Sequence, residues 1–262
     1  MFGKVSITFD DGLENVYSLA LPELERVGVT ATVFVISDLV GKRFDGWSVM
    51  SSKMLRSLRS KGWEIGSHTL THPNLTELSD SQLITELKDS KKHLEEITST
   101  RIVSFAYPFG AYDNRVKAIV ARHYTYARAV SCYPPLRTNT LSPNLLELSA
   151  MSTYEHAFAL PLHLFSNHIA KKISYRPRTR TSTTNNLSSS RKGLEARYVG
   201  KWIRKLRKDR WLILCFHNIS AKTEPTTYTI ALEEFRQIVN VIVKSADVVN
   251  LEEGTQSESQ SG

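Results

Sequence analysis

The sequence has few cysteines and no long apolar run, and each absence excludes a class of protein. Its only cysteines, Cys132 and Cys215, form no CxxC pair, so they predict no disulfide framework. We interpret both as small buried apolar side chains. No run of about 18 consecutive apolar residues exists, which excludes a predicted membrane-spanning helix. The first ten residues also lack the basic and then apolar order of a secretory signal. The sequence as written therefore favours a cytoplasmic location.

The composition present in the chain is that of a globular protein. Hydrophobic residues make up 41% of the 262 residues and charged residues 23%, close to the averages for folded domains. This length suits one large α/β domain. We predict a catalytic domain over residues 1–253 and a disordered tail over 254–262. A polar stretch rich in Ser, Thr and Asn predicts a mobile insertion loop at about 176–192.

The formal net charge of +8 is concentrated in one window. Residues 171–210 hold fourteen Lys and Arg against two acids, a charge of +12, which leaves −4 for the rest of the chain. Such a basic face is able to contact an anionic surface. The window lacks the interleaved aromatic residues of a stacking platform for nucleic acid, so we expect no nucleic-acid partner.

Patterns typical of strands and helices alternate along the chain. Strand patterns occur at residues 4–9, 30–36, 63–66, 103–107, 211–216 and 248–251, and helix patterns at 15–27, 51–60, 79–97, 116–122, 194–206 and 235–244. Strands that alternate with helices over short connections predict a parallel sheet or barrel with the helices outside.

Residues able to bind a metal follow two of the predicted strands. Asp10 and Asp11 end the first strand, and His68 and His72 follow the strand at 63–66 with the spacing of a shared metal site. Each feature alone also fits an ordinary turn or a chance pair of histidines. Together, Asp11 and the two histidines offer a carboxylate and two imidazoles, a set that suits zinc, iron or cobalt and leaves positions open for water and substrate.

Two further features lie after predicted strands. His217 follows the strand at 211–216, where a histidine is placed to protonate a leaving amine or to serve as an ordinary structural residue. The segment Tyr107-Pro108-Phe109-Gly110 predicts a tight turn. Such a turn is either an ordinary connection from strand to helix or one whose backbone N–H groups face a developing oxyanion.

The order of these segments resembles the polysaccharide deacetylase family, also known as the NodB homology or carbohydrate esterase family 4. The matching segments are Thr8-Phe9-Asp10-Asp11-Gly12, Ser67-His68-Thr69-Leu70-Thr71-His72-Pro73, Phe105-Ala106-Tyr107-Pro108-Phe109-Gly110 and the strand from Leu212 to His217. The resemblance implies a distorted (β/α) barrel and a bound divalent metal, usually zinc.

The resemblance also implies a role for each matching residue. Metal ligands would be Asp11, His68 and His72. Asp10 would be the general base and His217 the general acid. The backbone N–H of Phe109 would be an oxyanion donor.

The chain departs from the family pattern in two ways. It has no clear match to the fourth motif, the Asp and Trp element that supports the acid histidine, and it lacks an arginine in the third motif. Many members carry an arginine in the third motif that orients the base aspartate, and Ala106 stands there in this chain. Arg128 and Arg137 are the two candidates to replace it.

The predicted function is a metal-dependent hydrolase that removes N-acyl groups from an amino sugar, with an N-acetylated glycan or sugar conjugate as partner. Two alternatives stay open: a degenerate family member that binds a glycan without cleaving it, and an amidohydrolase of the same fold acting on a small amide or a formylated sugar.

Overall fold

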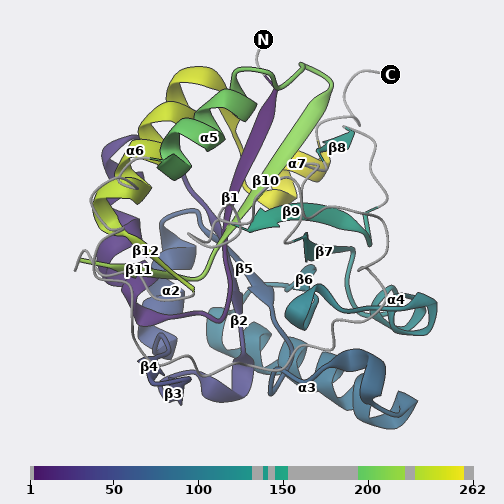
Figure 1. Ribbon diagram of the computed structural model, residues 1–262. Helices are drawn as coiled ribbons and strands as arrows, with labels where there is room; N and C mark the ends of the chain where they lie inside the picture. The colour runs from purple at the N-terminus through teal and green to yellow at the C-terminus, as the bar shows by residue number, and fades with distance from the viewer. Residues whose placement is uncertain (1–2, 132–137, 141–144, 153–193, 222–227, 257–262) are drawn as a thin grey trace, which may run out of the picture.

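The structure, a computed structural model, describes residues 3–131, 138–140, 145–152, 194–221 and 228–256. Seven parallel strands close a ring in the order β1-β2-β5-β6-β7-β9-β10, and β10 pairs back onto β1 (Figure 1). Their bounds are β1 Lys4–Phe9, β2 Thr32–Val35, β5 Glu64–Ser67, β6 Ser104–Ala106, β7 Tyr126–Ser131, β9 Leu148–Ser152 and β10 Arg210–Phe216. The predicted distorted (β/α) barrel is therefore confirmed.

Helices pack around the outside of this ring (Figure 1). They are the π-helical turn η1 Val16–Ala20, α1 Leu21–Arg26, α2 Ser52–Ser60, α3 Asp80–Thr98, α4 Asn114–Val120, α5 Leu194–Ile203 and α6 Leu232–Ser245. Local hydrogen bonds explain where two of them begin. The Ser51 hydroxyl accepts from the N–H of Met54 at the start of α2, and Ser79 with Gln82 forms a complete capping box at the start of α3.

Short elements complete the described chain. These are the 3-10 turns η2 Ser37–Leu39, η3 Leu75–Glu77 and η4 Pro108–Gly110, and the strands β3 Arg43–Phe44, β4 Trp47–Ser48, β8 Asn139–Thr140, β11 Asn218–Ser220, β12 Thr229–Ala231 and β13 Asp247–Val248. No described helix has the length and apolar character needed to cross a membrane. The predicted insertion loop at 176–192, and with it the basic window up to residue 193, lies outside the described residues.

The strands separate two apolar layers. Leu212 and Leu214 of β10 belong to the larger cluster, which includes Phe235 of α6 and fills the space between strands and helices. Trp211 and Ile213 alternate with them and belong to a smaller cluster. Because successive side chains of a strand point to opposite faces, this second cluster lies inside the barrel.

A last helix packs against one end of the barrel and corrects the predicted tail. Helix α7 spans Leu251–Gln256, so the tail predicted from residue 254 is wrong for residues 254–256, while 257–262 lie outside the described residues. A Cβ atom added to Gly254 would lie 2.4 Å from the Trp211 ring. This close packing on Trp211 explains why a glycine stands at position 254.

The N–H of Glu252 in the same helix donates to the buried Glu64 carboxylate at 3.0 Å. That carboxylate also accepts from the Tyr126 hydroxyl at 2.7 Å.

Candidate active site

The polar residues singled out in the sequence gather at one edge of the barrel. Asp10 and Asp11 follow β1, His68 follows β5 and His217 follows β10, so all of them lie at strand carboxyl ends, where α/β barrels carry their active sites. Backbone hydrogen bonds fix two of these positions. The N–H of Asp10 donates to Phe216 O at 2.9 Å, and the N–H of His68 donates to Val35 O at 2.9 Å.

Asp11, His68 and His72 form a compact set of metal-binding atoms. The Nε2 atoms of His68 and His72 each lie 3.7 Å from Asp11 Oδ1. Zinc bonds of about 2.0–2.2 Å at a tetrahedral angle place nitrogen and oxygen ligands about 3.4 Å apart. A small contraction of the site would therefore bring the three atoms to ligand distances.

The protonation states of the set also fit a cation. His68 Nδ1 lies 2.8 Å from Ala106 O, so Nδ1 carries the hydrogen and the Nε2 lone pair faces Asp11. Burial lowers the pKa of His68 to about 4 and that of His72 to about 3, which keeps both imidazoles neutral, the form that binds metals. Burial and the charge of Asp10 raise the pKa of Asp11 to about 8. A bound cation would favour the ionised form of Asp11 and so oppose this rise in its pKa. These residues therefore fit a bound divalent metal.

Backbone strain is concentrated in the same segments. Six described residues other than glycine have a positive φ, a conformation that side chains disfavour. Four of them lie in the first three of the family-like segments: Asp11 at 67°, Thr69 at 69°, His72 at 67° and Phe109 at 60°. Such strain persists only where the surrounding contacts hold it. The neighbouring side chains and backbone therefore hold the site in this conformation.

Glu86 of α3 holds the strained histidine loop in place, and no sequence pattern pointed to this residue. Its Oε2 accepts from the N–H groups of Leu70 and Thr71 at 2.9 Å each, and its Oε1 accepts from the Thr71 hydroxyl at 2.7 Å. Inside the loop, the N–H of His72 donates to Thr69 Oγ1 at 2.8 Å. A carboxylate on a helix therefore holds the loop that presents His72.

Arg128 of β7 resolves the departure at Ala106. Its Nη2 donates to Asp10 Oδ1, its side chain is fully buried, and its guanidinium lies 4.8 Å from the centre of the Phe34 ring. Arg128 is the register partner of Ala106 on the neighbouring strand. The proposal that Arg128 replaces the family arginine is thus supported by geometry, and Arg137 lies outside the described residues.

The Arg128 contact sets the charge of Asp10. Burial by itself would raise the pKa of Asp10, but the positive charge of Arg128, the neighbouring imidazoles of His68 and His217 and the Arg128 hydrogen bond outweigh burial and hold that pKa well below its usual range. Asp10 is therefore ionised at neutral pH. Since Oδ1 is taken by Arg128, Oδ2 is the oxygen that faces the other polar side chains.

Three groups approach Asp10 Oδ2. The Nε2 atoms of His68 and His217 each lie 3.9 Å away, and Cys215 Sγ lies at 3.4 Å as a hydrogen-bond donor. Burial lowers the pKa of His217 to about 4, with Asp10 opposing the shift. Burial and Asp10 raise the pKa of the Cys215 thiol. Cys215 is buried as predicted, but it also contacts the carboxylate of the site.

Aromatic side chains surround the site. Phe109 is 64% exposed and its ring centre lies 4.7 Å from that of His72. The centre of the Phe44 ring lies 5.3 Å from that of His72. Tyr228 lies 5.6 Å from His217. Trp47, in the same hairpin as Phe44, is also exposed. The site therefore opens between flat apolar surfaces.

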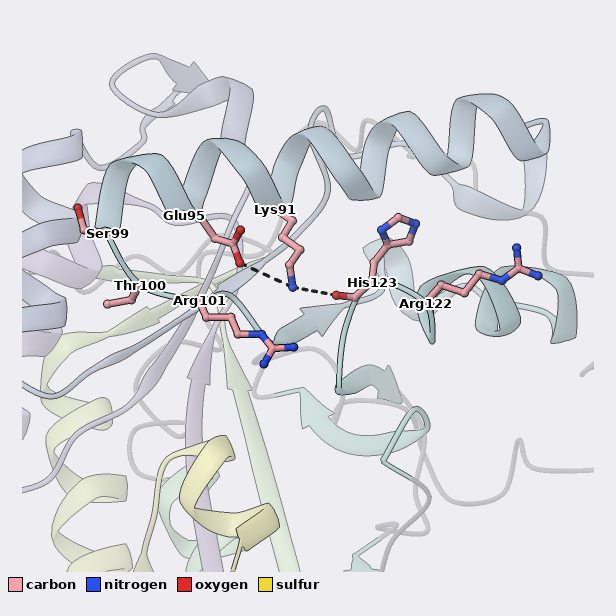
Figure 2. A pocket seen from close by; sticks show the side chains of 7 residues that line it. All are labelled: Lys91, Glu95, Ser99, Thr100, Arg101, Arg122 and His123. Atoms are coloured by element: carbon pink, nitrogen blue, oxygen red, sulfur yellow. Dashed lines mark hydrogen bonds and ion pairs between the residues drawn. The ribbon is translucent and has the colours of Figure 1, made fainter.

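A separate hollow of about 630 Å³ lies away from these residues (Figure 2). It is bounded by the end of α3 and by Arg101, Arg122 and His123, which precede β6 and β7 and so lie at the opposite edge of the barrel. Lys91 in its wall already donates to the carbonyl oxygen of His123 at 2.9 Å (Figure 2). This hollow is not part of the candidate active site.

Comparisons with known proteins agree with this geometry. Residues 2–127 match the model of the polysaccharide deacetylase family. The poly-beta-1,6-N-acetyl-D-glucosamine N-deacetylase of Staphylococcus aureus (strain MRSA252) is 32% identical over 121 residues, which are 42% of this chain and 42% of that protein. The Streptococcus pyogenes deacetylase PplD, solved in complex with acetate, is 27% identical with a TM-score of 0.50, over 56% of this chain and 62% of that chain.

A more distant structure extends the similarity of fold. The T48 deacetylase, solved with substrate, has a TM-score of 0.57 at 16% identity and covers 97% of this chain and 90% of that one. The resemblance to the polysaccharide deacetylase family predicted from the sequence is confirmed by this family match, which covers residues 2–127. The chain spans less than half the length of the curated relatives that it matches.

Proposed function

We propose that the protein is a metal-dependent hydrolase that removes N-acetyl groups from an amino sugar in a polysaccharide or glycoconjugate. One observation carries the proposal. A buried, ionised Asp10 held by Arg128 lies beside the ligand set of Asp11, His68 and His72, in a chain whose relatives include an N-deacetylase of a poly-N-acetylglucosamine.

A divalent cation on that ligand set would act as a Lewis acid toward the amide carbonyl. Asp10 is proposed as the general base. Its Oδ2 accepts the proton of the attacking water, because Arg128 occupies Oδ1 and holds the carboxylate in one orientation. General base catalysis of this kind contributes about 10²–10⁴-fold to the rate.

His217 is proposed as the general acid that protonates the leaving amine. This role requires the imidazolium form, which the neighbouring Asp10 favours and burial opposes. The Phe109 N–H is proposed as an oxyanion donor, and one good donor of this kind contributes about 3 kcal/mol. The positive φ of Phe109 in this tight turn supports the role of its N–H as a donor, because strained backbone conformations often occur at functional sites.

The exposed aromatic rings support a sugar as substrate. Phe109, Trp47 and Tyr228 are three of the four large hydrophobic side chains exposed in the described chain. Exposed apolar surface beside a polar site marks a place of binding. The flat faces of these rings suit the flat apolar faces of a sugar ring.

The alternative of a glycan-binding member without activity is weakened. Its motivation was the missing arginine at Ala106, and Arg128 supplies a guanidinium from the next strand. An amidohydrolase acting on a small amide or a formylated sugar uses the same side chains, and only a substrate assay distinguishes it.

The test is release of acetate from a panel of N-acetylated glycans and sugar conjugates, measured with chelator and with added zinc. We expect activity that chelator abolishes and zinc restores. His72→Ala is expected to lose metal and activity together, whereas His217→Ala keeps the metal and loses turnover. Equal metal content in wild type and His72→Ala would contradict the ligand assignment. Release of formate but not acetate would favour the formylated-sugar alternative.

A further inference from the structure

Cys215 contacts two residues of the proposed reaction and has no part in it. Its sulfur lies 3.4 Å from Asp10 Oδ2 and 3.9 Å from His217 Nδ1. The side chain is fully buried, on the inner face of β10. A thiol, an imidazole and a carboxylate therefore place ligand atoms within 4.8 Å of one another, separately from the Asp11, His68 and His72 set.

The distance between the thiol sulfur and the carboxylate oxygen matches the coordination of a soft divalent cation. Zinc bonds of about 2.3 Å to sulfur and about 2.1 Å to oxygen, at a tetrahedral angle, place the two ligands about 3.6 Å apart. The observed distance between Cys215 Sγ and Asp10 Oδ2 is 3.4 Å. Thiolate selects soft cations such as zinc over magnesium or calcium. The first ligand set contains no sulfur, so the two sets differ in the cations that they prefer.

We propose that Asp10, Cys215 and His217 form a second cation site, selective for zinc- and cadmium-like ions, and that its occupation stops the reaction. On binding, the S–H bond breaks, the proton passes to the buffer, and the sulfur, Asp10 Oδ2 and an imidazole nitrogen take the cation. Inhibition rests on the proposed function, because the same carboxylate oxygen and imidazole would move the protons of the reaction. Binding itself does not rest on it.

The second site is weaker than the first. Arg128 holds Asp10 Oδ1, so only one carboxylate oxygen is offered, and the arginine charge repels a cation nearby. A cation on Asp11 adds to that repulsion. The first equivalent of metal is therefore expected on Asp11, His68 and His72, and the second site fills only in excess.

Cadmium titration of the protein tests binding without any substrate. A bound thiolate gives a cadmium–sulfur charge-transfer absorption in the ultraviolet, which nitrogen and oxygen ligands do not give. Wild type, Cys215→Ser and Cys132→Ser form a matched set, because Cys132 is the chain's other cysteine. We expect the band to appear with the second equivalent in wild type and Cys132→Ser, and to be absent in Cys215→Ser.

Two further variants keep the outcome decisive. His72→Ala should lose the first equivalent and keep the band. His217→Ala keeps the thiol and should weaken the band-forming site at least tenfold, which covers the case that Cys215→Ser does not fold. A wild type without the band, or a band lost in Cys132→Ser and kept in Cys215→Ser, overturns the proposal.

Acetate release separates this proposal from the function itself. If the enzyme is a deacetylase, excess cadmium should inhibit wild type and leave Cys215→Ser at least tenfold less sensitive. The band without acetate release from any substrate would support the cation site and count against the function. Acetate release without the band would support the function and count against the cation site.

Discussion

The Asp10–Arg128 pair gives the most quantitative prediction. Both side chains are buried, so Arg128→Met leaves the Asp10 charge inside the barrel without its partner. Breaking a buried ion pair from one side costs about 3–5 kcal/mol. For a chain of this size about 1 kcal/mol corresponds to about 2–4 °C in Tm, so the variant should melt about 6–20 °C lower. Asp10→Asn should cost a similar amount, because it leaves Arg128 buried and unopposed.

The double variant decides whether the loss comes from the pair. With both charges removed, Asp10→Asn with Arg128→Met should be more stable than the sum of the single losses by at least about 2 kcal/mol. Unfolding in urea, followed by tryptophan fluorescence with chelator present, measures all four proteins free of metal linkage. Arg236→Met removes a pair in which the arginine is half-exposed and Glu23 keeps Arg26 as a second partner, so it should cost less than about 1 kcal/mol. Additive losses at Asp10 and Arg128 would refute the reasoning.

Four further changes test the supports of the site and of the barrel. Glu86→Ala releases the loop that carries a ligand, and we expect metal affinity, measured by competition with a chromophoric chelator, to fall about 10–100-fold with little change in fold. Gly254→Val places a side chain into Trp211 and should lower the free energy of unfolding by about 1–3 kcal/mol, measured in urea. Burial raises the pKa of Glu64, so the folded chain keeps a proton that the unfolded chain loses above about pH 4.3. The free energy of unfolding therefore falls as the pH rises from about 4.3 to the pKa of Glu64 in the folded chain. Glu64→Gln should remove that part of the slope in Tm measured from pH 4 upward, and an unchanged slope would show that another group causes it. Phe109→Ala removes a ring but keeps the backbone N–H, so it should raise KM more than it lowers kcat in the acetate assay; a loss in kcat alone would count against a sugar-binding role.

Local patterns in the sequence were sufficient to identify the two aspartates and the histidine pair of the site. Asp10 and Asp11 follow the same strand, and His68 and His72 lie in the same loop. The two aspartates are therefore close to each other, and the two histidines are close to each other, because each pair is close in sequence. Helix starts at Ser51 and Ser79 were equally local, because each cap bonds an N–H three residues away. Such features are readable from sequence because the interacting groups are near one another along the chain.

Strands β7 and β9 were not predicted, because no comparable local pattern marks them. Strand β7 carries Arg128 in its middle, and an arginine normally indicates a solvent-exposed position. Its burial depends on Asp10, which lies 118 residues earlier. In the same way, a strand was expected at 248–251 and a tail from 254, whereas β13 spans Asp247–Val248 and α7 spans Leu251–Gln256.

Short segments of the sequence are enough to identify the reactive groups: two adjacent carboxylates, a histidine pair and a third histidine, each after a strand. Which of these groups face one another depends on the tertiary structure. The register of β6 and β7 places Arg128 beside Ala106, closure of β10 onto β1 brings Cys215 and His217 to Asp10, and packing of α3 brings Glu86 to the histidine loop. These contacts join residues far apart in the chain, and they exist only because the strands close into a ring, which no local pattern specifies.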